Sequence, residues 1–228
     1  MSPDPVRPAV IDQLVHNLDV LDRSVKNGYA GGVARPREFD EGEVLLAARD
    51  RFWSTGYAAT TLDDVVMATG LGKGSLYGAF GDKHRLFLRV FDDYCAGVVD
   101  TVRDSLEGPD SGAYERLRAH VRAVATSTAD DTARRGCLLA KGTAELAGQD
   151  PAVADRAAQT IDDLEGLLAA CVEQAQRHGD IKPSADPHQI AGLLLAVLRG
   201  IEALGKAGRS RSALTSIADA VLAALPRP

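Results

Sequence analysis

Histidines and paired acidic residues are the side chains in this sequence most suited to catalysis or metal binding. The histidines are scattered, and none stands near another histidine or a cysteine at a metal-ligand spacing (His16, His84, His120, His178, His188). Asp-Asp pairs begin at residues 63, 92, 130 and 162. Neighbours in a helix point about 100° apart, so such pairs are solvated faces or helix caps rather than acid/base dyads. Motifs of serine hydrolases, phosphate-binding loops and zinc proteases are also missing. We therefore expect no catalytic residue, no metal site and no cofactor, and we predict that the protein is not an enzyme.

The polar run from residue 72 to 75 suggests a different chemistry. Gly72 and Gly74 permit a partner to approach the backbone closely. Lys73 supplies positive charge, and Ser75 can donate or accept a hydrogen bond. A helix that reads base edges in DNA needs small or polar residues of this kind in its first half. The run is therefore a candidate reading helix.

Other polar groups nearby are suited to phosphate oxygens. Tyr77 and Lys83 end in polar tips, and Thr61 offers a hydroxyl and a backbone amide. The helix that opens near Lys83 adds backbone donors and a favourable dipole. Arg35 and Arg37 precede them as a basic arm. We expect the positive side chains on one face, with the acids turned away (Arg35, Arg37, Lys73, Lys83, Arg85). The predicted DNA contacts are Arg35, Arg37, Thr61, Gly72, Lys73, Gly74, Ser75, Tyr77 and Lys83.

These residues are positioned by two short helices and a glycine turn. Thr61 is a predicted N-cap with Asp64 in a capping-box position, and Gly70 makes the turn. The second short helix covers 73–80, and a long third helix follows Asp82. This layout is that of a helix-turn-helix, whose second helix enters the DNA major groove. The residues alone also allow an ordinary helical corner with Tyr77 partly buried.

Apolar residues elsewhere recur every three or four positions, which predicts an all-α fold. The remaining helices are expected at about 9–26, 40–54, 82–108, 112–129, 151–178, 187–206 and 212–225, with a broken pair at 133–148 interrupted by Gly142. Residues 9–26 are a capped amphipathic helix, which favours a genuine extension. The alternative is that translation starts at Val33 and that residues 1–32 are upstream sequence.

Composition and charge favour a cytoplasmic protein and argue against one coated in nucleic acid. The net charge is −6, but residues 35–90 carry eight basic and eight acidic side chains and are neutral. Such a module has modest non-specific affinity and depends on a specific site. Three widely spaced cysteines indicate a reducing compartment, and neither a signal peptide nor a membrane-spanning apolar run is expected. We divide the chain into an extension (1–34), a DNA-binding domain (35–85) and a helical domain (86–228).

Residues 35–90 resemble the DNA-binding segment of tetracycline-repressor (TetR) family regulators. The matching residues are Gly56-Tyr57, Thr60-Thr61-Leu62, Val65, Ala68-Thr69-Gly70-Leu71, Lys73-Gly74-Ser75-Leu76-Tyr77, Phe80, Asp82-Lys83 and Leu86-Phe87. The segment departs from the family at Gly72, Val66, Gly78 and Ala79, so an operator sequence cannot be carried over. The resemblance implies a homodimer that binds a palindromic operator in double-stranded DNA. It also implies a C-terminal domain that dimerises through its last long helices and holds a small-molecule effector.

The resemblance places the effector pocket among the helices that start near 83, 112, 133 and 151. Candidate pocket residues there are Phe91, Tyr94, Cys95, His120, Cys137, Leu138 and Cys171. For His120 the alternative is a structural or exposed histidine. For Cys137 the neighbouring Arg134 and Arg135 suggest a lowered thiol pKa and a thiol sensor, and the alternative is a buried structural cysteine.

Two functions from different classes remain at this point. The first is a dimeric, sequence-specific transcriptional regulator, a repressor by analogy with the family, whose DNA affinity is controlled by a small molecule. The second is an all-helical sensor or interaction protein with a degenerate DNA-binding module, which Gly78, Ala79 and the neutral charge would allow.

Overall fold

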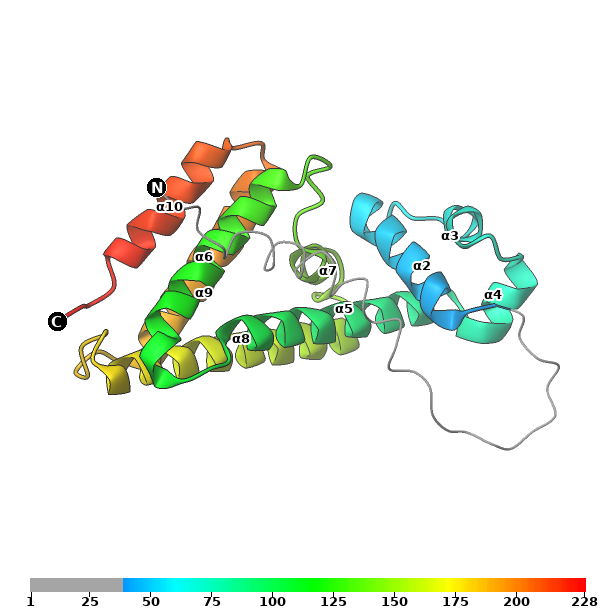
Figure 1. Cartoon of the computed structure of the whole chain (residues 1–228). Helices are drawn as coiled ribbons and strands as arrows, with labels where there is room; N and C mark the ends of the chain where they lie inside the picture. Colours follow the sequence, from blue (N-terminus) through cyan, green and yellow to red (C-terminus); the bar gives the residue numbers. More distant parts are fainter. Residues whose placement is uncertain (1–38) are drawn as a thin grey trace, which may run out of the picture.

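The computed structural model describes residues 39–228, which fold entirely into helices and their connections (Figure 1). The all-α prediction is confirmed for this part of the chain. The predicted helix at 9–26, the linker after it, and Arg35 and Arg37 lie outside the described residues.

Three short helices at one end of the molecule form the helix-turn-helix unit (Figure 1). They are α2 (Glu41–Thr55), α3 (Leu62–Thr69) and α4 (Lys73–Phe80). Asp40 caps α2 by accepting from the backbone of Gly42 and Glu43. Gly56 and Gly70 end α2 and α3 at positive φ, a conformation that glycine adopts without steric cost. The local capping and turn chemistry therefore specifies these boundaries.

The long helix α5 (Lys83–Leu106) leads away from this unit, and α6 (Ala113–Asp130) returns from its far end. The next helix is α7 (Leu138–Leu146), which corrects the prediction of a broken pair at 133–148. Gly142 lies inside α7 without interrupting it, and its small size allows α7 to pack closely against α5. A Cβ on Gly142 would lie 2.6 Å from the Phe91 ring, so glycine lets the two helices approach.

Three further helices complete the chain: α8 (Pro151–His178), α9 (Pro187–Lys206) and α10 (Arg211–Ala223). Asp150 and Asp186 cap α8 and α9, each followed by proline at the first helical position as the sequence predicts. Figure 1 shows α8 running alongside α5, while α6, α9 and α10 pack together at the end remote from α2–α4.

The buried apolar residues form two clusters, and α5 contributes to both. The cluster nearer α2–α4 includes Phe52, Phe87 and Phe91, together with the start of α7. The other is built from the second half of α5 with α6, α8, α9 and α10. The helix-turn-helix therefore shares its core with α5, α7 and α8. The domain division after residue 85 stays a prediction.

Among the described helices, α9 alone is long and apolar enough to span a membrane by length and composition, which the sequence reading overlooked. Only 39% of the apolar stretch of α9 is buried within the chain. It packs against α6, α8 and α10, as the core helix of a globular protein does, while part of its surface remains uncovered.

Candidate nucleic-acid interface and adjoining pocket

The start of α3 is held by the capping box that the sequence predicts. The Thr61 hydroxyl accepts from the Asp64 amide at 3.1 Å, and the Asp64 carboxylate accepts from the Thr61 amide at 2.8 Å. The Thr61 hydroxyl also donates to the same carboxylate at 2.7 Å. These bonds lower the pKa of Asp64 and keep it ionised, with Arg51 3.0 Å away as a further cause. Thr61 is thus fixed and exposed at the end of the unit.

The helix α4 buries one side and exposes the other. Leu76 and Phe80 are buried in the core, whereas Gly72, Lys73, Gly74, Ser75, Tyr77 and Gly78 are all exposed. A Cβ added at Gly72, Gly74 or Gly78 would meet nothing within 4 Å. Packing within the chain therefore does not require glycine at these positions. Their lack of side chains leaves a low surface on which a backbone or base edge can approach α4 closely.

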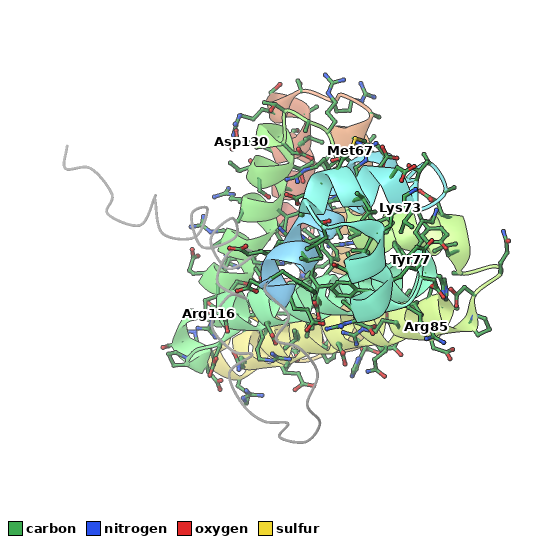
Figure 2. The ribbon with its side chains drawn as sticks, turned by 90° about the vertical axis from the view of Figure 1, so that its right-hand side faces the viewer. Met67, Lys73, Tyr77, Arg85, Arg116 and Asp130 are labelled. Carbon is green, nitrogen blue, oxygen red and sulfur yellow. The ribbon has the colours of Figure 1, made fainter. Side chains whose placement is uncertain are left out.

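Figure 2 looks onto this end of the molecule and shows Met67, Lys73, Tyr77 and Arg85 across it. Tyr77 is 50% exposed and presents its phenol to solvent. Met67 is 75% exposed on α3 and was not singled out in the sequence. An exposed methionine beside a reading helix offers apolar contact of the kind that a thymine methyl accepts. Only the exposure of the Met67 side chain distinguishes it from a core residue, and this exposure is known only from the folded structure.

The acids are not turned away from this face, which corrects the expected charge separation. Lys73 forms an ion pair with Asp63 at 2.6 Å, and Arg85 lies 3.9 Å from Asp82. Hydrogen bonding to Asp63 raises the pKa of Lys73. Both residues of the Lys73–Asp63 pair are more than half exposed, so water screens the attraction. The face is close to neutral, in agreement with the charge count.

Lys83 helps to hold the unit together, and its predicted phosphate contact stays a prediction. Its ammonium donates to the carbonyls of Tyr57 at 2.9 Å and Thr60 at 2.8 Å, and it lies 4.1 Å from the Tyr57 ring centroid. At the same helix start, the Asp82 carboxylate accepts from the Arg85 amide. At least one of the backbone N–H groups expected to be free at the start of α5 is therefore already bonded within the chain.

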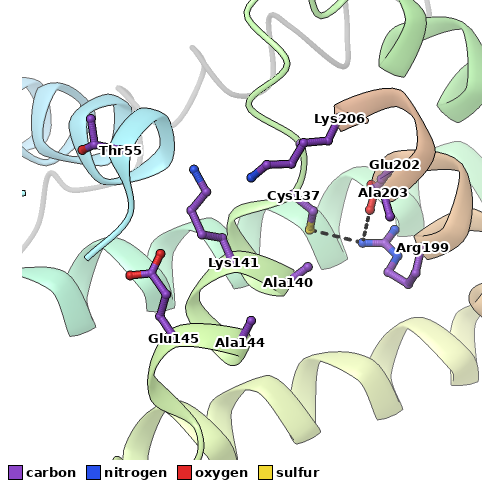
Figure 3. Close-up of a pocket in the computed structure, with 11 residues that line it drawn as sticks. Thr55, Cys137, Ala140, Lys141, Ala144, Glu145, Arg199, Glu202, Ala203 and Lys206 are labelled. Atoms are coloured by element: carbon purple, nitrogen blue, oxygen red, sulfur yellow. Dashed lines mark hydrogen bonds and ion pairs between the residues drawn. The ribbon is translucent and has the colours of Figure 1, made fainter. Parts of the chain in front are cut away.

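A cavity of about 480 Å³ lies between the end of α2, helix α7 and the last turns of α9 (Figure 3). This volume is within the range of small-molecule sites in proteins. Small residues form part of its wall, with Cys137 at the start of α7. The charged lining residues are Lys141, Glu145, Arg199, Glu202 and Lys206.

Only Cys137 of the seven predicted pocket residues lines this cavity. Tyr94 and Leu138 adjoin it, because the Tyr94 hydroxyl accepts from the Leu138 amide at 3.3 Å and lies 3.7 Å from the Cys137 sulfur. Phe91 and Cys95 are buried in the same apolar cluster. The structure thus brings the Tyr94, Cys137 and Leu138 group together at the cavity wall.

The other two candidates lie elsewhere in the packing. Cys171 belongs to the second cluster, where its thiol donates to the Ala113 carbonyl. His120 is buried on α6, and its Nδ1 shares a 2.9 Å hydrogen bond with the Ser105 hydroxyl. Burial, with the Arg199 charge nearby, lowers the pKa of His120 to about 4 and keeps it neutral.

The environment of Cys137 differs from the thiolate site that the sequence suggested. Burial raises the pKa of its thiol, and the Glu202 charge acts in the same direction. The sulfur lies 3.4 Å from a guanidinium nitrogen of Arg199, which is 62 residues away, whereas Arg135 stacks over the Trp53 ring at 4.3 Å. The sequence neighbours therefore do not activate this thiol.

Helix α7 also joins the cavity to the helix-turn-helix. The Lys141 ammonium donates to the carbonyls of Trp53 and Ser54 at the end of α2. The Glu145 carboxylate accepts from the Ala58 amide at 3.0 Å. The Trp53 indole donates to the Gly136 carbonyl at 2.6 Å. Residues that line or border the cavity thus hold the last turn of α2.

The sequence reading missed the charged residues of the cavity, although it held a signal for some of them. Helix α9 is almost wholly apolar, and its acidic and basic residues are Arg199, Glu202 and Lys206, spaced by three and four. That spacing puts them on one helix face. Charges confined to one face of a core helix mark a polar site within the packing. Their partners on α7 are apparent only in the fold.

Two family models match this chain. The model described as "Bacterial regulatory proteins, tetR family" covers residues 44–90, and the one described as "Tetracyclin repressor-like, C-terminal domain" covers residues 113–221. Together they span the helix-turn-helix and most of the helices that follow α5.

Curated proteins and solved structures give the same picture. The chain is 28% identical over 192 residues to the "HTH-type transcriptional repressor ComR" of Escherichia coli (strain K12), covering 84% of this chain and 91% of that protein. It is 24% identical over 174 residues to the "HTH-type transcriptional repressor DhaR" of Mycobacterium sp. (strain GP1), covering 76% and 86%. A structure of the TetR family transcriptional regulator CifR, a cysteine mutant with a 26bp double-strand operator DNA, aligns with a TM-score of 0.73 and 29% identity, covering 84% of this chain and all of that one.

Proposed function

The chain belongs to the TetR family of transcriptional regulators, which bind DNA, and on this basis we propose that it is a homodimeric repressor whose operator affinity a small molecule controls. In this proposal α4 of each subunit enters one half-site of a palindromic operator in double-stranded DNA. The effector binds in the helical part of the chain, and the protein works in the cytoplasm, where its DNA is.

The observation that carries the DNA part of the proposal is the exposed face of α4. Its glycines have open space around them, and Lys73, Ser75 and Tyr77 stand beside them. The similarity to CifR, whose structure contains operator DNA, supports the same use of this face. The names of the curated relatives ComR and DhaR support repression.

An uncharged stripe on α9 supports the homodimer. Gly192, Leu193, Ala196 and Gly200 follow one side of α9 at helical spacing, and Leu193 is 51% exposed. A Cβ at Gly200, or at Gly166 on α8, would meet nothing within 4 Å. Small and apolar residues without charge are what two helices need to pack closely against a second copy.

The cavity between α2, α7 and α9 supports effector control. Its wall includes residues that hold the end of α2, so a molecule bound there would act on the helix-turn-helix directly. A ligand shifts the equilibrium between the DNA-binding and the released conformations only as far as it binds one of them more tightly. Contacts to lysine and glutamate side chains that also hold α2 would provide such a difference in affinity.

The experiment that tests this proposal is an unbiased selection of bound duplexes from random and genomic DNA, followed by affinity measurement. A palindromic site bound far more tightly than unrelated duplexes, at two subunits per site, is expected. Lys73→Ala and Tyr77→Ala should weaken that site, whereas Lys182→Ala, an exposed lysine between α8 and α9, should not.

Failure to select any sequence at low salt would contradict the proposal. Equal affinity of the Lys73→Ala and Tyr77→Ala variants and the parent for the best site would favour the alternative, a helical sensor with a degenerate module. A selected site whose affinity no small molecule changes would remove effector control and leave the DNA-binding role in place.

A further inference from the structure

Two lysines face each other across the cavity without a carboxylate partner. Lys141 comes from α7 and Lys206 from α9, and Figure 3 shows both side chains reaching into the same space. Among the described residues, the ion pairs include neither of them. Burial lowers the pKa of Lys141, and the nearby Lys206 lowers it further. An anion between the two ammoniums would relieve this repulsion.

The carboxylates of the wall are placed differently with respect to the lysines. Glu202 pairs with Arg199 at 3.0 Å. Glu145 accepts from the Ala58 amide, and its charge opposes, without cancelling, the lowering of the Lys141 pKa. The lining thus has three cations against two carboxylates, and the excess lies on the lysines. The Nε of Arg199 is buried and has no hydrogen-bond partner, which leaves a donor for an incoming oxygen atom. The apolar part of the cavity wall includes Ala140, Ala144 and Ala203.

The same lysine connects the cavity to the DNA-binding unit. The Lys141 ammonium caps α2 by donating to the Trp53 and Ser54 carbonyls, which the helix leaves without intrahelical donors. An anion that attracts this ammonium would compete with both carbonyls. Charge-assisted bonds to a carboxylate are stronger than bonds to a neutral carbonyl, so the competition favours the anion.

We propose that this cavity binds a small organic anion of the carboxylate class between Lys141 and Lys206, and that binding draws Lys141 away from the end of α2. The proposal rests on the effector-controlled function proposed above and specifies its ligand class. It makes Lys141 the residue through which occupancy of the cavity reaches the helix-turn-helix.

Trp53 provides a readout that does not depend on DNA. It is the single tryptophan of the chain, its carbonyl accepts from Lys141, and its indole donates to Gly136 in the cavity wall. We would titrate the full chain with butyrate, hexanoate and benzoate, each compared with its neutral amide. At least one carboxylate should change the Trp53 emission saturably, and its amide should not.

Charge variants separate this site from general anion binding. Lys206→Gln should weaken the carboxylate response at least tenfold, because it removes one of the two ammoniums. Lys182→Gln makes the same chemical change at an exposed lysine away from the cavity and should leave the response intact. Circular dichroism and melting curves would show that both variants fold.

Several outcomes would overturn the anion site: no response to any of the carboxylates, an equal response to the amides, or an unchanged response in folded Lys206→Gln. These results are distinguishable from failure of the proposed function. Carboxylate binding seen by Trp53 without any change in operator affinity would uphold the site and contradict effector control. Operator release by uncharged molecules alone would contradict the anion and uphold the regulator.

Discussion

At the scale of single residues, Lys73 explains how the proposed interface can combine low net charge with DNA binding. Its ion pair with Asp63 is exposed and screened, so exchanging that carboxylate for a phosphate costs little. The pair keeps Lys73 from adding a free charge when no DNA is bound. The neutral balance of residues 35–90 then limits non-specific attraction, and affinity depends on fit.

We therefore predict opposite effects for the two members of this pair. Lys73→Ala should weaken operator binding and reduce the slope of log affinity against log salt by about one. Asp63→Asn should strengthen binding to unrelated duplexes at low salt, because it leaves the ammonium unpaired. Fluorescence anisotropy between about 50 and 200 mM salt measures both effects. An unchanged slope in Lys73→Ala would show that this lysine makes no phosphate contact.

His120 sets a pH dependence of stability at the same scale. Its folded-state pKa of about 4 lies below the ordinary value of 6.5. As the pH falls below 6.5 the unfolded chain takes up a proton that the folded chain refuses. The free energy of unfolding therefore declines between pH 6.5 and 4, by up to about 1.4 kcal/mol per pH unit from this group, and is unaffected by it above that window.

The test is urea unfolding of His120→Asn at pH 7.5 and pH 5. Asparagine can keep the hydrogen bond to Ser105 but does not titrate. Whatever its stability at pH 7.5, the variant should lose less stability on acidification than the parent chain does. Equal losses in the two proteins would mean that His120 is not held neutral by burial.

At the scale of helices, glycine has opposite purposes in α4 and α7. In α4 the glycines face open space, and the fold gains nothing from them. In α7, Gly142 lies against the buried Phe91 ring, and the fold needs it. A glycine inside a helix costs roughly 0.5–1 kcal/mol relative to alanine, so the α4 glycines make sense only if something outside the chain approaches them.

A matched pair of alanine substitutions tests this distinction. Gly74→Ala should raise the free energy of unfolding by roughly 0.5–1 kcal/mol while it weakens operator binding. Gly142→Ala should lower stability by about 1–3 kcal/mol, since its Cβ would overlap the Phe91 ring. Chemical denaturation and operator titration of both variants provide the measurements. Stability gained without any loss of affinity at Gly74 would remove this glycine from the interface.

At the scale of the whole molecule, the uncharged stripe on α9 predicts how subunits associate. Ala196→Glu places a charge at its centre and should yield a monomer that binds the operator much more weakly, because the two reading helices lose their fixed spacing. Ala220→Glu makes the same change on an exposed position of α10 and should stay dimeric. Analytical ultracentrifugation and operator titration distinguish these outcomes. A dimeric Ala196→Glu protein would place the interface elsewhere.

Local patterns in the sequence were sufficient for most of the elements. Helices begin and end where side chains and turns make bonds between near neighbours in the chain. The capping residues are Asp40, Thr61, Asp82, Asp150 and Asp186, helped by glycines at turns and prolines at first helical positions. The same local density of motif residues identified the helix-turn-helix and its family. The predicted break at Gly142 was wrong because the surroundings of this glycine are set by Phe91, 51 residues earlier in the chain.

The sequence by itself determined the helices, the all-α class and the module that meets DNA, since each depends on residues a few positions apart. Only the tertiary structure decided how Lys83 is used, which carboxylate accompanies Lys73, and that Arg199 rather than Arg134 or Arg135 reaches Cys137. It also brought Lys141 and Lys206 to one cavity beside the end of α2. Electrostatic environments and cavities arise from side chains far apart in the chain, and no spacing along the sequence encodes them.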